Sequence, residues 1–157
     1  MSHLYLALKL MHVIGATMLF GTGLGIAFFM FMANRTRDPA TIAHTARTVV
    51  IADAVFIATA VVLQPLTGWG MAAMTGVSLF HFWMKATLVL YIFVGLCWLP
   101  VVWIQTRMRD LAAAAARDGT ALPPRYFSYY KVWFALGWPA FAGVIAIFIL
   151  MLWKPQW

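Results

Sequence analysis

Charged residues, and acidic ones above all, are scarce in this chain. Its 157 residues include only 4 Asp and Glu against 11 Lys and Arg, and charged residues make up 10% of the sequence. Hydrophobic residues make up 64%. A water-soluble domain carries about 25% charged residues, so this composition excludes that class. The chain is therefore predicted to be an integral membrane protein in contact with the lipid bilayer.

Cysteine is almost absent as well. The single cysteine, Cys97, excludes a disulfide framework and any metal site built on paired cysteines. The basic excess gives a formal net charge of +7, but no basic groove or base-stacking module accompanies it. In a membrane protein such an excess is typical of cytoplasmic loops and attracts anionic lipids. We therefore expect no nucleic-acid partner.

Long apolar segments dominate the chain instead. A helix needs roughly 20 residues to cross a bilayer, and four segments reach that length: Leu4–Ala33, Val49–Met74, Phe80–Gln105 and Tyr129–Trp153. The first lacks a charged leader and is too long for a signal peptide, so we expect it to be retained. The predicted fold is all-α, a membrane four-helix bundle that forms a single domain over residues 1–157.

The arginines predict the orientation of this bundle. The first and third connections between spans hold seven arginines, whereas Met74–Leu79 holds none. Positively charged loops stay in the cytoplasm, so both chain ends and Met74–Leu79 are expected on the outer, periplasmic side. Most tryptophans are expected to mark the membrane interfaces, with Trp69 and Trp83 at the outer one and Trp103 and Trp133 at the inner one.

Two ionisable side chains lie inside the first span. Lys9 and His12 are three residues apart, so they project from roughly one face of a helix. Burying an ionisable group in hydrocarbon costs on the order of 2.5–3.5 kcal/mol, which calls for partners or a function. Six polar side chains lie at a similar depth below the outer ends of their helices. We expect them to form one pocket that contains no acidic residue: Lys9, His12, Gln64, Thr67, His81 and Lys85.

Lysines without a carboxylate call for an anionic ligand or a cofactor carboxylate. The alternative is that Lys9 and Lys85 extend to lipid headgroups. His12 lies too deep for that, which leaves a ligand or proton role or a buried hydrogen bond between helices. Met71 and Met74, near the outer end of the second span, could bind Cu(I) or supply an axial haem ligand, or simply face lipid.

Three further features predict how the helices pack. Thr17, Gly21 and Gly25 recur every four residues and are expected to let another helix approach closely. Pro65 removes a backbone donor, so it should bend the second span and leave a carbonyl for a neighbouring group to satisfy. Asp53 is expected to pair with one of three basic residues: Arg47, Arg107 or Lys131.

Six segments carry a family resemblance: YLALKLMHVIGATMLFGTGLGIAFFM, VVIADAVF, VVLQPLTG, CWLPVVWIQTRMRDL, LPPRY and WFALGWPAF. They resemble a bacterial family of predicted integral membrane proteins, the domain of unknown function 2269 family. This resemblance covers nearly the whole chain. It implies a multi-pass protein of the bacterial inner (plasma) membrane and names no activity.

Two remoter resemblances concern function. Leu8–Val13 followed by a glycine-rich helix, a lysine early in the third span and a terminal Lys-Pro are similar to the HemJ-type protoporphyrinogen oxidases. The HemJ resemblance implies a b-type haem bound by His12, with Lys85 as the catalytic residue near a porphyrin or substrate carboxylate. The first-helix histidine and third-helix lysine are also similar to the CopD copper-resistance domain. That resemblance implies copper transport or delivery through His12, His81, Met71 and Met74.

Three functions are therefore open at this point. The first is a haem-b redox protein, with an enzyme activity linked to a porphyrinogen or a quinol, in which Lys9, Gln64, Thr67 and His81 lie with His12 beside the cofactor. The second is a copper transport or delivery protein. The third is a non-catalytic bundle, either a homo-oligomer or an accessory subunit of a larger membrane complex.

Overall fold

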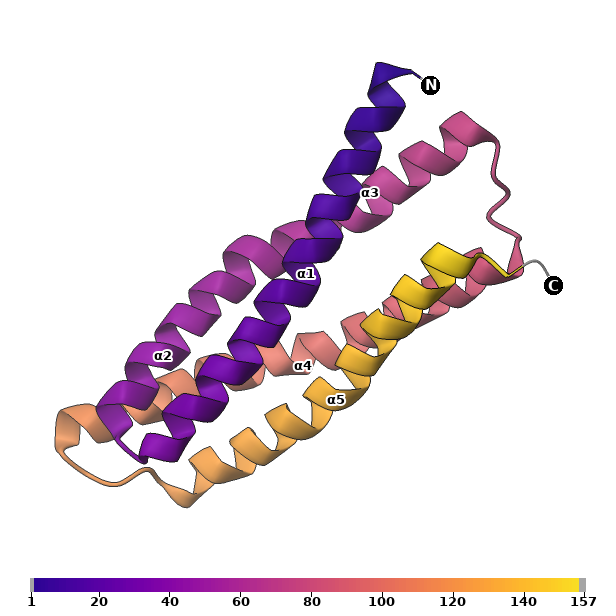
Figure 1. The fold of residues 1–157 in the computed structure, drawn as a ribbon. Coiled ribbons are helices and arrows are strands. Elements are labelled where there is room, and N and C mark those ends of the chain that lie inside the picture. Colours follow the sequence, from indigo (N-terminus) through magenta and orange to yellow (C-terminus); the bar gives the residue numbers. More distant parts are fainter. Residues whose placement is uncertain (1, 156–157) are drawn as a thin grey trace.

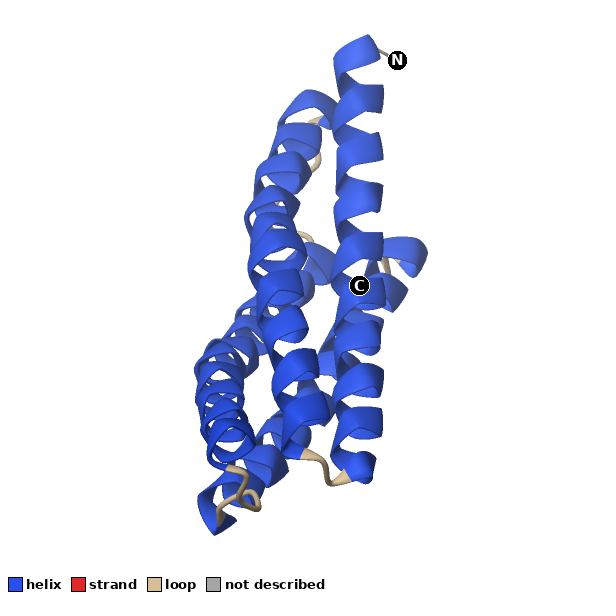
Figure 2. Cartoon of the chain, turned by 90° about the vertical axis from the view of Figure 1, so that its left-hand side faces the viewer, coloured by secondary structure: helices blue, strands red, loops and turns tan. Residues whose placement is uncertain are grey.

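The structure, a computed structural model, describes residues 2–155 and consists of helices joined by short loops (Figure 1, Figure 2). Its elements are α1 (His3–Thr36), α2 (Pro39–Ala52), η1 (Asp53–Ile57), α3 (Ala58–Thr75), α4 (Phe82–Asp118) and α5 (Pro124–Trp153). The π-helix η1 joins α2 to α3, so Pro39–Thr75 is one continuous helix. Within the described residues, four helices are long and apolar enough to cross a membrane. The prediction of an all-α chain with four spans is confirmed.

The helices extend well beyond the predicted apolar spans at one end of the molecule. The continuous helix formed by α2, η1 and α3 begins at Pro39 rather than at Val49. Helix α4 continues to Asp118 rather than ending at Gln105. The Ala112–Ala116 run explains the extension of α4, because alanine has the highest helix propensity. The two polar connections predicted at this end are therefore largely helical, and they shrink to residues 37–38 and 119–123.

Capping residues determine the sharp turn between α1 and α2. Arg37 ends α1 in the left-handed region, with φ of 56°. Asp38 is the N-cap of α2 and accepts hydrogen bonds from the hydroxyl and backbone N–H of Thr41 and from the N–H of Ala40. These bonds, that of the Thr41 hydroxyl first, hold the pKa of the Asp38 carboxyl below its ordinary value. Asp38-Pro39 is thus the start of a helix.

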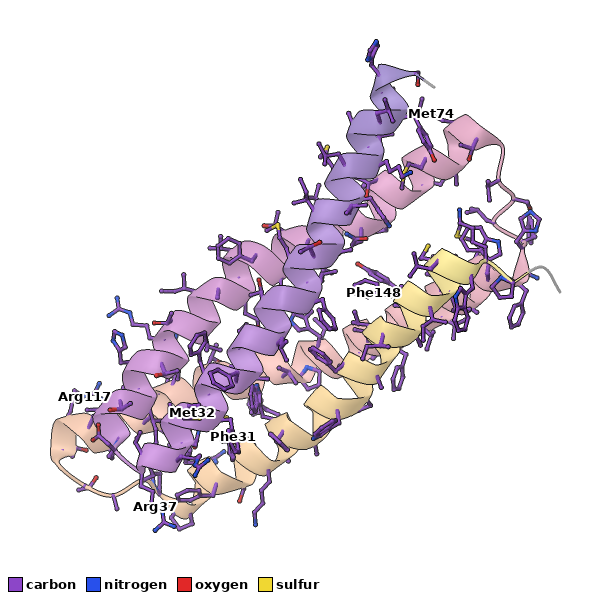
Figure 3. The ribbon with its side chains drawn as sticks, in the orientation of Figure 1. Phe31, Met32, Arg37, Met74, Arg117 and Phe148 are labelled. Atoms are coloured by element: carbon purple, nitrogen blue, oxygen red, sulfur yellow. The ribbon has the colours of Figure 1, made fainter. Side chains whose placement is uncertain are left out.

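The turns at residues 37–38 and 119–123, which have arginines in or beside them, lie at one end of the molecule (Figure 1). We call it the basic end; Figure 3 shows Arg37 and Arg117 there. Both ends of the described chain and residues 76–81, which connect α3 to α4, lie at the opposite end, which we call the terminal end. This antiparallel arrangement is the one that the loop charges predict.

The helices pack as two pairs that meet at the basic end. α1 packs along α3, and α4 packs along α5, while α2 packs on α4 and α1. Toward the terminal end the α1–α3 pair diverges from the α4–α5 pair (Figure 1). The contact that holds the two pairs together is therefore concentrated around α2.

Burial follows the same division. The largest fully buried side chains belong to the core around the basic end: Tyr126, Met30, Ile42 and Met108. The terminal end exposes large apolar side chains instead, among them Leu4, Leu10, Phe80 and Leu152. Burying an apolar side chain stabilises the fold when the side chain is removed from water, but not when it is removed from lipid tails. The exposed apolar faces are therefore expected to contact the bilayer.

The close approach of α1 to α3 depends on a glycine other than the predicted ones. A Cβ atom at Gly15 would lie 2.6 Å from Nε2 of Gln64. Thr17 and Gly21 are exposed, and a Cβ at Gly21 would meet no described atom within 4 Å. The prediction that the stripe of Thr17, Gly21 and Gly25 packs on another helix is therefore wrong within this chain, because the stripe begins on an exposed face.

Pro65 lies inside α3, which continues through it. Its ring nitrogen cannot donate to the Val61 carbonyl, one helical turn earlier. The hydroxyl of Tyr91 on α4 donates to that carbonyl instead. The predicted need for a neighbouring donor is confirmed, and this bond links α3 to α4 between the diverging helix pairs.

We predict that Gly143→Ala destabilises the contact between α4 and α5. A Cβ atom at Gly143 would lie 2.6 Å from Cγ2 of Val94. The helices must therefore move apart, at a cost of about 1–3 kcal/mol. Thermal unfolding in detergent should show a lower Tm.

Gly137→Ala on the same helix is the matched control. Its added Cβ meets no neighbour within 4 Å in the described chain, so the Tm should stay constant or rise, because alanine favours a helix over glycine. An equal Tm for Gly143→Ala and Gly137→Ala would contradict the packing of α4 on α5.

Candidate functional site

His12 on α1 is bound to α3 through both its ring and its backbone. Nδ1 of the imidazole lies 2.8 Å from the hydroxyl oxygen of Thr67. The side-chain amide of Gln64 donates to the His12 carbonyl over 2.8 Å. Gln64 and Thr67 are buried and lie three residues apart, so both address the face of α3 that packs on α1. His12 itself is half-buried against them.

The hydrogen bonds of Thr67 determine which nitrogen of His12 carries the proton. The hydroxyl has one hydrogen, which it donates to the Leu63 carbonyl at 2.6 Å, with the Gln64 carbonyl at 3.2 Å as a weaker acceptor. Its oxygen can then only accept, so Nδ1 of His12 is the donor. In a neutral imidazole this leaves a lone pair on Nε2. Metal-binding histidines are held by a bond of this kind at their other ring nitrogen.

Two glycines leave the space that these side chains occupy. A Cβ atom at Gly68 would lie 3.4 Å from Cε1 of His12, at the short limit of ordinary van der Waals contact. A Cβ at Gly15 would lie 2.6 Å from the Gln64 amide nitrogen. A side chain at either position would push the His12 ring or the Gln64 amide from its place.

The structure brings together three of the six residues predicted to form one pocket: His12, Gln64 and Thr67. The other three are exposed: Lys9, His81 and Lys85. Lys85 shares a face of α4 with exposed apolar residues, namely Leu88, Ile92 and Leu96, so that face is turned to lipid. Its Nζ lies 5.8 Å from the centre of the Phe80 ring. The partners of His12 in this structure are therefore Thr67 and Gln64, and not Lys85.

The two methionines considered for copper lie near the terminal end of α3. Met71 is half-buried, one helical turn beyond Thr67, whereas Met74 is 42% exposed (Figure 3). Across residues 2–155, no three His, Cys, Asp or Glu side chains gather closely enough to hold a metal ion. His12 is level with Thr67, so Met71 lies one helical turn from it toward the terminal end.

A cavity of about 460 Å³ lies between the two helix pairs. It runs along α1 from Ala16 to Ala27, or roughly 16 Å, and begins one helical turn from His12 on the same face. Figure 3 shows Phe148 reaching from α5 toward α1, where its ring centre lies 5.6 Å from that of Phe20. The lining is mostly apolar, and its polar members are Asp53, Gln64, Tyr91, Gln105 and the indoles of Trp98, Trp133 and Trp138.

Asp53 lies at the basic end of this cavity and is only 2% exposed. Nε1 of Trp98 donates to Oδ1 of the carboxylate over 3.0 Å. The amide nitrogen of Gln105 donates to Oδ2 over 2.7 Å, and the amide oxygen accepts from Nε1 of Trp133 over 3.1 Å. The predicted ion pair of Asp53 is wrong, because neutral donors hold the carboxylate while the three basic candidates are exposed: Arg47, Arg107 and Lys131.

Sequence reasoning missed this network. A carboxylate in an apolar segment was the available signal, but Trp98, which binds it, is 45 residues away and follows no local pattern. Two tryptophans expected at the membrane interfaces are buried instead, Trp83 at 6% exposure and Trp133 at 5%. Trp83 packs against Lys154, whose Nζ lies 5.6 Å from the ring centre, and Trp133 bonds to Gln105.

Residues 6–155 match the family described as predicted integral membrane protein (DUF2269), a range that includes both the His12 and the Asp53 contacts. The chain belongs to this family. The match confirms the family resemblance of the six sequence segments and identifies a multi-pass integral membrane protein. No curated protein and no solved structure matches this DUF2269 member.

In this DUF2269 member we predict that Thr67→Val releases the ring of His12. Valine has the shape of threonine without the hydroxyl, so Nδ1 loses its acceptor. Nitrogen-15 NMR of labelled histidine should show the Nδ1–H tautomer in the wild type and a mixture of tautomers in the variant. The free energy of unfolding should fall by about 1 kcal/mol.

Thr75→Val is the control for this experiment. The Thr75 hydroxyl bonds only to backbone carbonyls within α3, so its removal should leave the tautomer of His12 unchanged. A single Nδ1–H tautomer that persists in Thr67→Val would contradict the role assigned to Thr67.

Proposed function

We propose that this protein binds a b-type haem through His12 and takes part in membrane redox chemistry. The observation that supports this best is the hydrogen bond from Nδ1 of His12 to Thr67, because it leaves the lone pair of Nε2 free. An imidazole oriented in this way would be able to hold a haem through that lone pair. Haem, when bound, would supply the one-electron chemistry.

The residues around His12 fit that role. Gln64 holds the backbone of His12 in place, and the absence of a side chain at Gly68 leaves room for the imidazole edge that carries Cε1. Met71 is our candidate for a second residue that would hold the haem, because a thioether is a known haem ligand and the residue lies one turn from Thr67. Lys9, on the same face of α1 as His12 and nearer the terminal end, is our candidate cation for a haem propionate.

Lys85 has a different place in this proposal. It projects from the lipid-facing side of α4 near the terminal end, one turn after His81. From there we expect it to meet an anionic group that arrives along the membrane interface, such as a substrate carboxylate. The reductants that we propose are a porphyrinogen or a lipid-soluble quinol, and Lys85 would act as the catalytic residue toward the former.

Copper is the second candidate ligand, and the position of Met71 favours it. Thioether ligands suit Cu(I), and Met71 and Met74 lie three residues apart on α3. His81 is exposed and is the N-cap of α4, which packs on α2 and α5. The copper proposal therefore depends on His12 and Met71, with Met74 at the periphery.

We predict that the protein purified from membranes shows a Soret band and, after dithionite, the visible bands of a ferrous b-type haem. His12→Ala should lose both, because it removes the proposed ligand. Thr67→Val should bind haem about 10- to 100-fold more weakly. The measurement is the absorption spectrum in detergent, combined with a pyridine haemochrome assay and elemental analysis.

His44→Ala is the matched control, because His44 is exposed on α2 and should be dispensable. A wild-type spectrum in His12→Ala, or folded wild-type protein without haem, would contradict the proposal. Bound copper that is lost in Met71→Ala would favour the copper alternative.

We also propose that the basic end lies in the cytoplasm of a bacterial plasma membrane, with the terminal end outside. The arginines in and beside the two turns at the basic end support this, since positively charged segments resist translocation. We predict that alkaline phosphatase fused after Pro155 is active, while the same enzyme inserted within residues 119–123 is inactive. The reverse pattern of activities would show that the orientation is inverted.

A further inference from the structure

The hydrogen bonds around Asp53 fit an ionised carboxylate. Trp133 can only donate, so it occupies the amide oxygen of Gln105 and turns the amide nitrogen toward Asp53. Trp98 can likewise only donate. Both oxygens of Asp53 therefore receive a donor, at 3.0 Å from Trp98 and 2.7 Å from Gln105. These partners offer no acceptor for a proton on the carboxyl group.

This carboxylate has no cationic partner within residues 2–155. The ion pair found there joins Arg109 to Asp110 over 2.8 Å at the surface, away from Asp53. The three basic side chains that the sequence suggested as ion-pair partners of Asp53 are exposed: Arg47, Arg107 and Lys131. A buried charge without a counterion is strongly unfavourable, and carboxylates inside membrane segments commonly mark ligand or ion pathways. The missing positive charge therefore calls for a ligand.

The cavity that begins at Asp53 has walls suited to such a ligand. Aromatic side chains from three helices line it, including Phe20, Tyr91, Trp98, Trp138 and Phe148. The faces of aromatic rings attract organic cations, most strongly where water is excluded. Its volume of about 460 Å³ lies in the range of small-molecule binding sites.

We propose that this cavity binds a lipophilic organic monocation, with the positive charge against Asp53 and the apolar body along the aromatic walls. The carboxylate repels anions of the same shape. A compact inorganic cation finds only one carboxylate there and too few oxygen ligands to replace its hydration shell. Binding of such a cation does not depend on haem binding at His12, because His12 does not line the cavity.

The test uses the full chain in lipid nanodiscs and tetraphenylphosphonium as the probe. Quenching of tryptophan fluorescence, corrected with empty nanodiscs, reports binding, and isothermal titration gives the stoichiometry. We expect saturable binding of one probe per chain. Asp53→Asn should weaken it by at least about tenfold, whereas Asp53→Glu should retain most of it. Tetraphenylborate, which has the same shape and the opposite charge, should not compete.

A second variant keeps the test decisive if Asp53→Asn fails to fold. Gly137 lines the cavity, and an added Cβ there meets no described side chain within 4 Å, so Gly137→Leu should fill the space without disturbing the helices. We expect it to abolish probe binding with an unchanged Tm. Gly21→Leu adds the same side chain on an exposed face and should bind as the wild type does.

Two results would overturn the proposal: unsaturable uptake by the wild type, or equal affinity in the wild type and in folded Asp53→Asn or Gly137→Leu. His12→Ala separates this inference from the haem proposal. It should lose haem and retain tetraphenylphosphonium binding, so each proposal can fail without the other.

Discussion

Hydrocarbon offers no hydrogen-bond partners, so a polar group inside a membrane helix depends on other groups of the protein. This constraint explains the polar contacts between the helices of this chain. Tyr91 satisfies the Val61 carbonyl, and Thr67 accepts from His12. Because each bond joins two helices, the groups that satisfy the backbone also hold the helices in register. The buried hydroxyl of Thr87 is the exception, with no partner among the described residues.

The two ends of the molecule are stabilised differently. At the basic end, α2 and the extended part of α4 bury apolar side chains, with Ile42 and Met108 at 0% exposure. This is the packing of a water-soluble core, in which the hydrophobic effect contributes directly. Toward the terminal end the helix pairs diverge, and glycine contacts and hydrogen bonds carry the association. The cavity that begins at Asp53 extends into that diverging region, whereas His12 lies in the contact of α1 with α3.

The sequence predicted those features that depend on position along the chain. Apolar length predicted the four spans, arginine content predicted which turns share an end, and Pro65 predicted a carbonyl in need of a donor. Features that depend on the direction of a side chain were predicted less well. Lys85 was expected beside His12, although Ile92, one of several exposed apolar residues on its face, already indicates a lipid-facing side. The partners of Asp53 could not be predicted, because no local pattern marks an indole or an amide as a distant hydrogen-bond donor.

The π-helix η1 has a consequence for how this chain is compared with relatives. A π-helix corresponds to an α-helix that has gained one residue, and each residue of an α-helix turns it by about 100°. The extra residue in η1 therefore rotates α3 about the helix axis. Each face of α3 points in a different direction from the one it would have if α2 continued into α3 as an unbroken α-helix. A relative that lacks the extra residue has to be aligned with its gap inside Asp53–Ile57. A gap placed elsewhere would set Gln64 and Thr67 against residues that project from a different side of the helix.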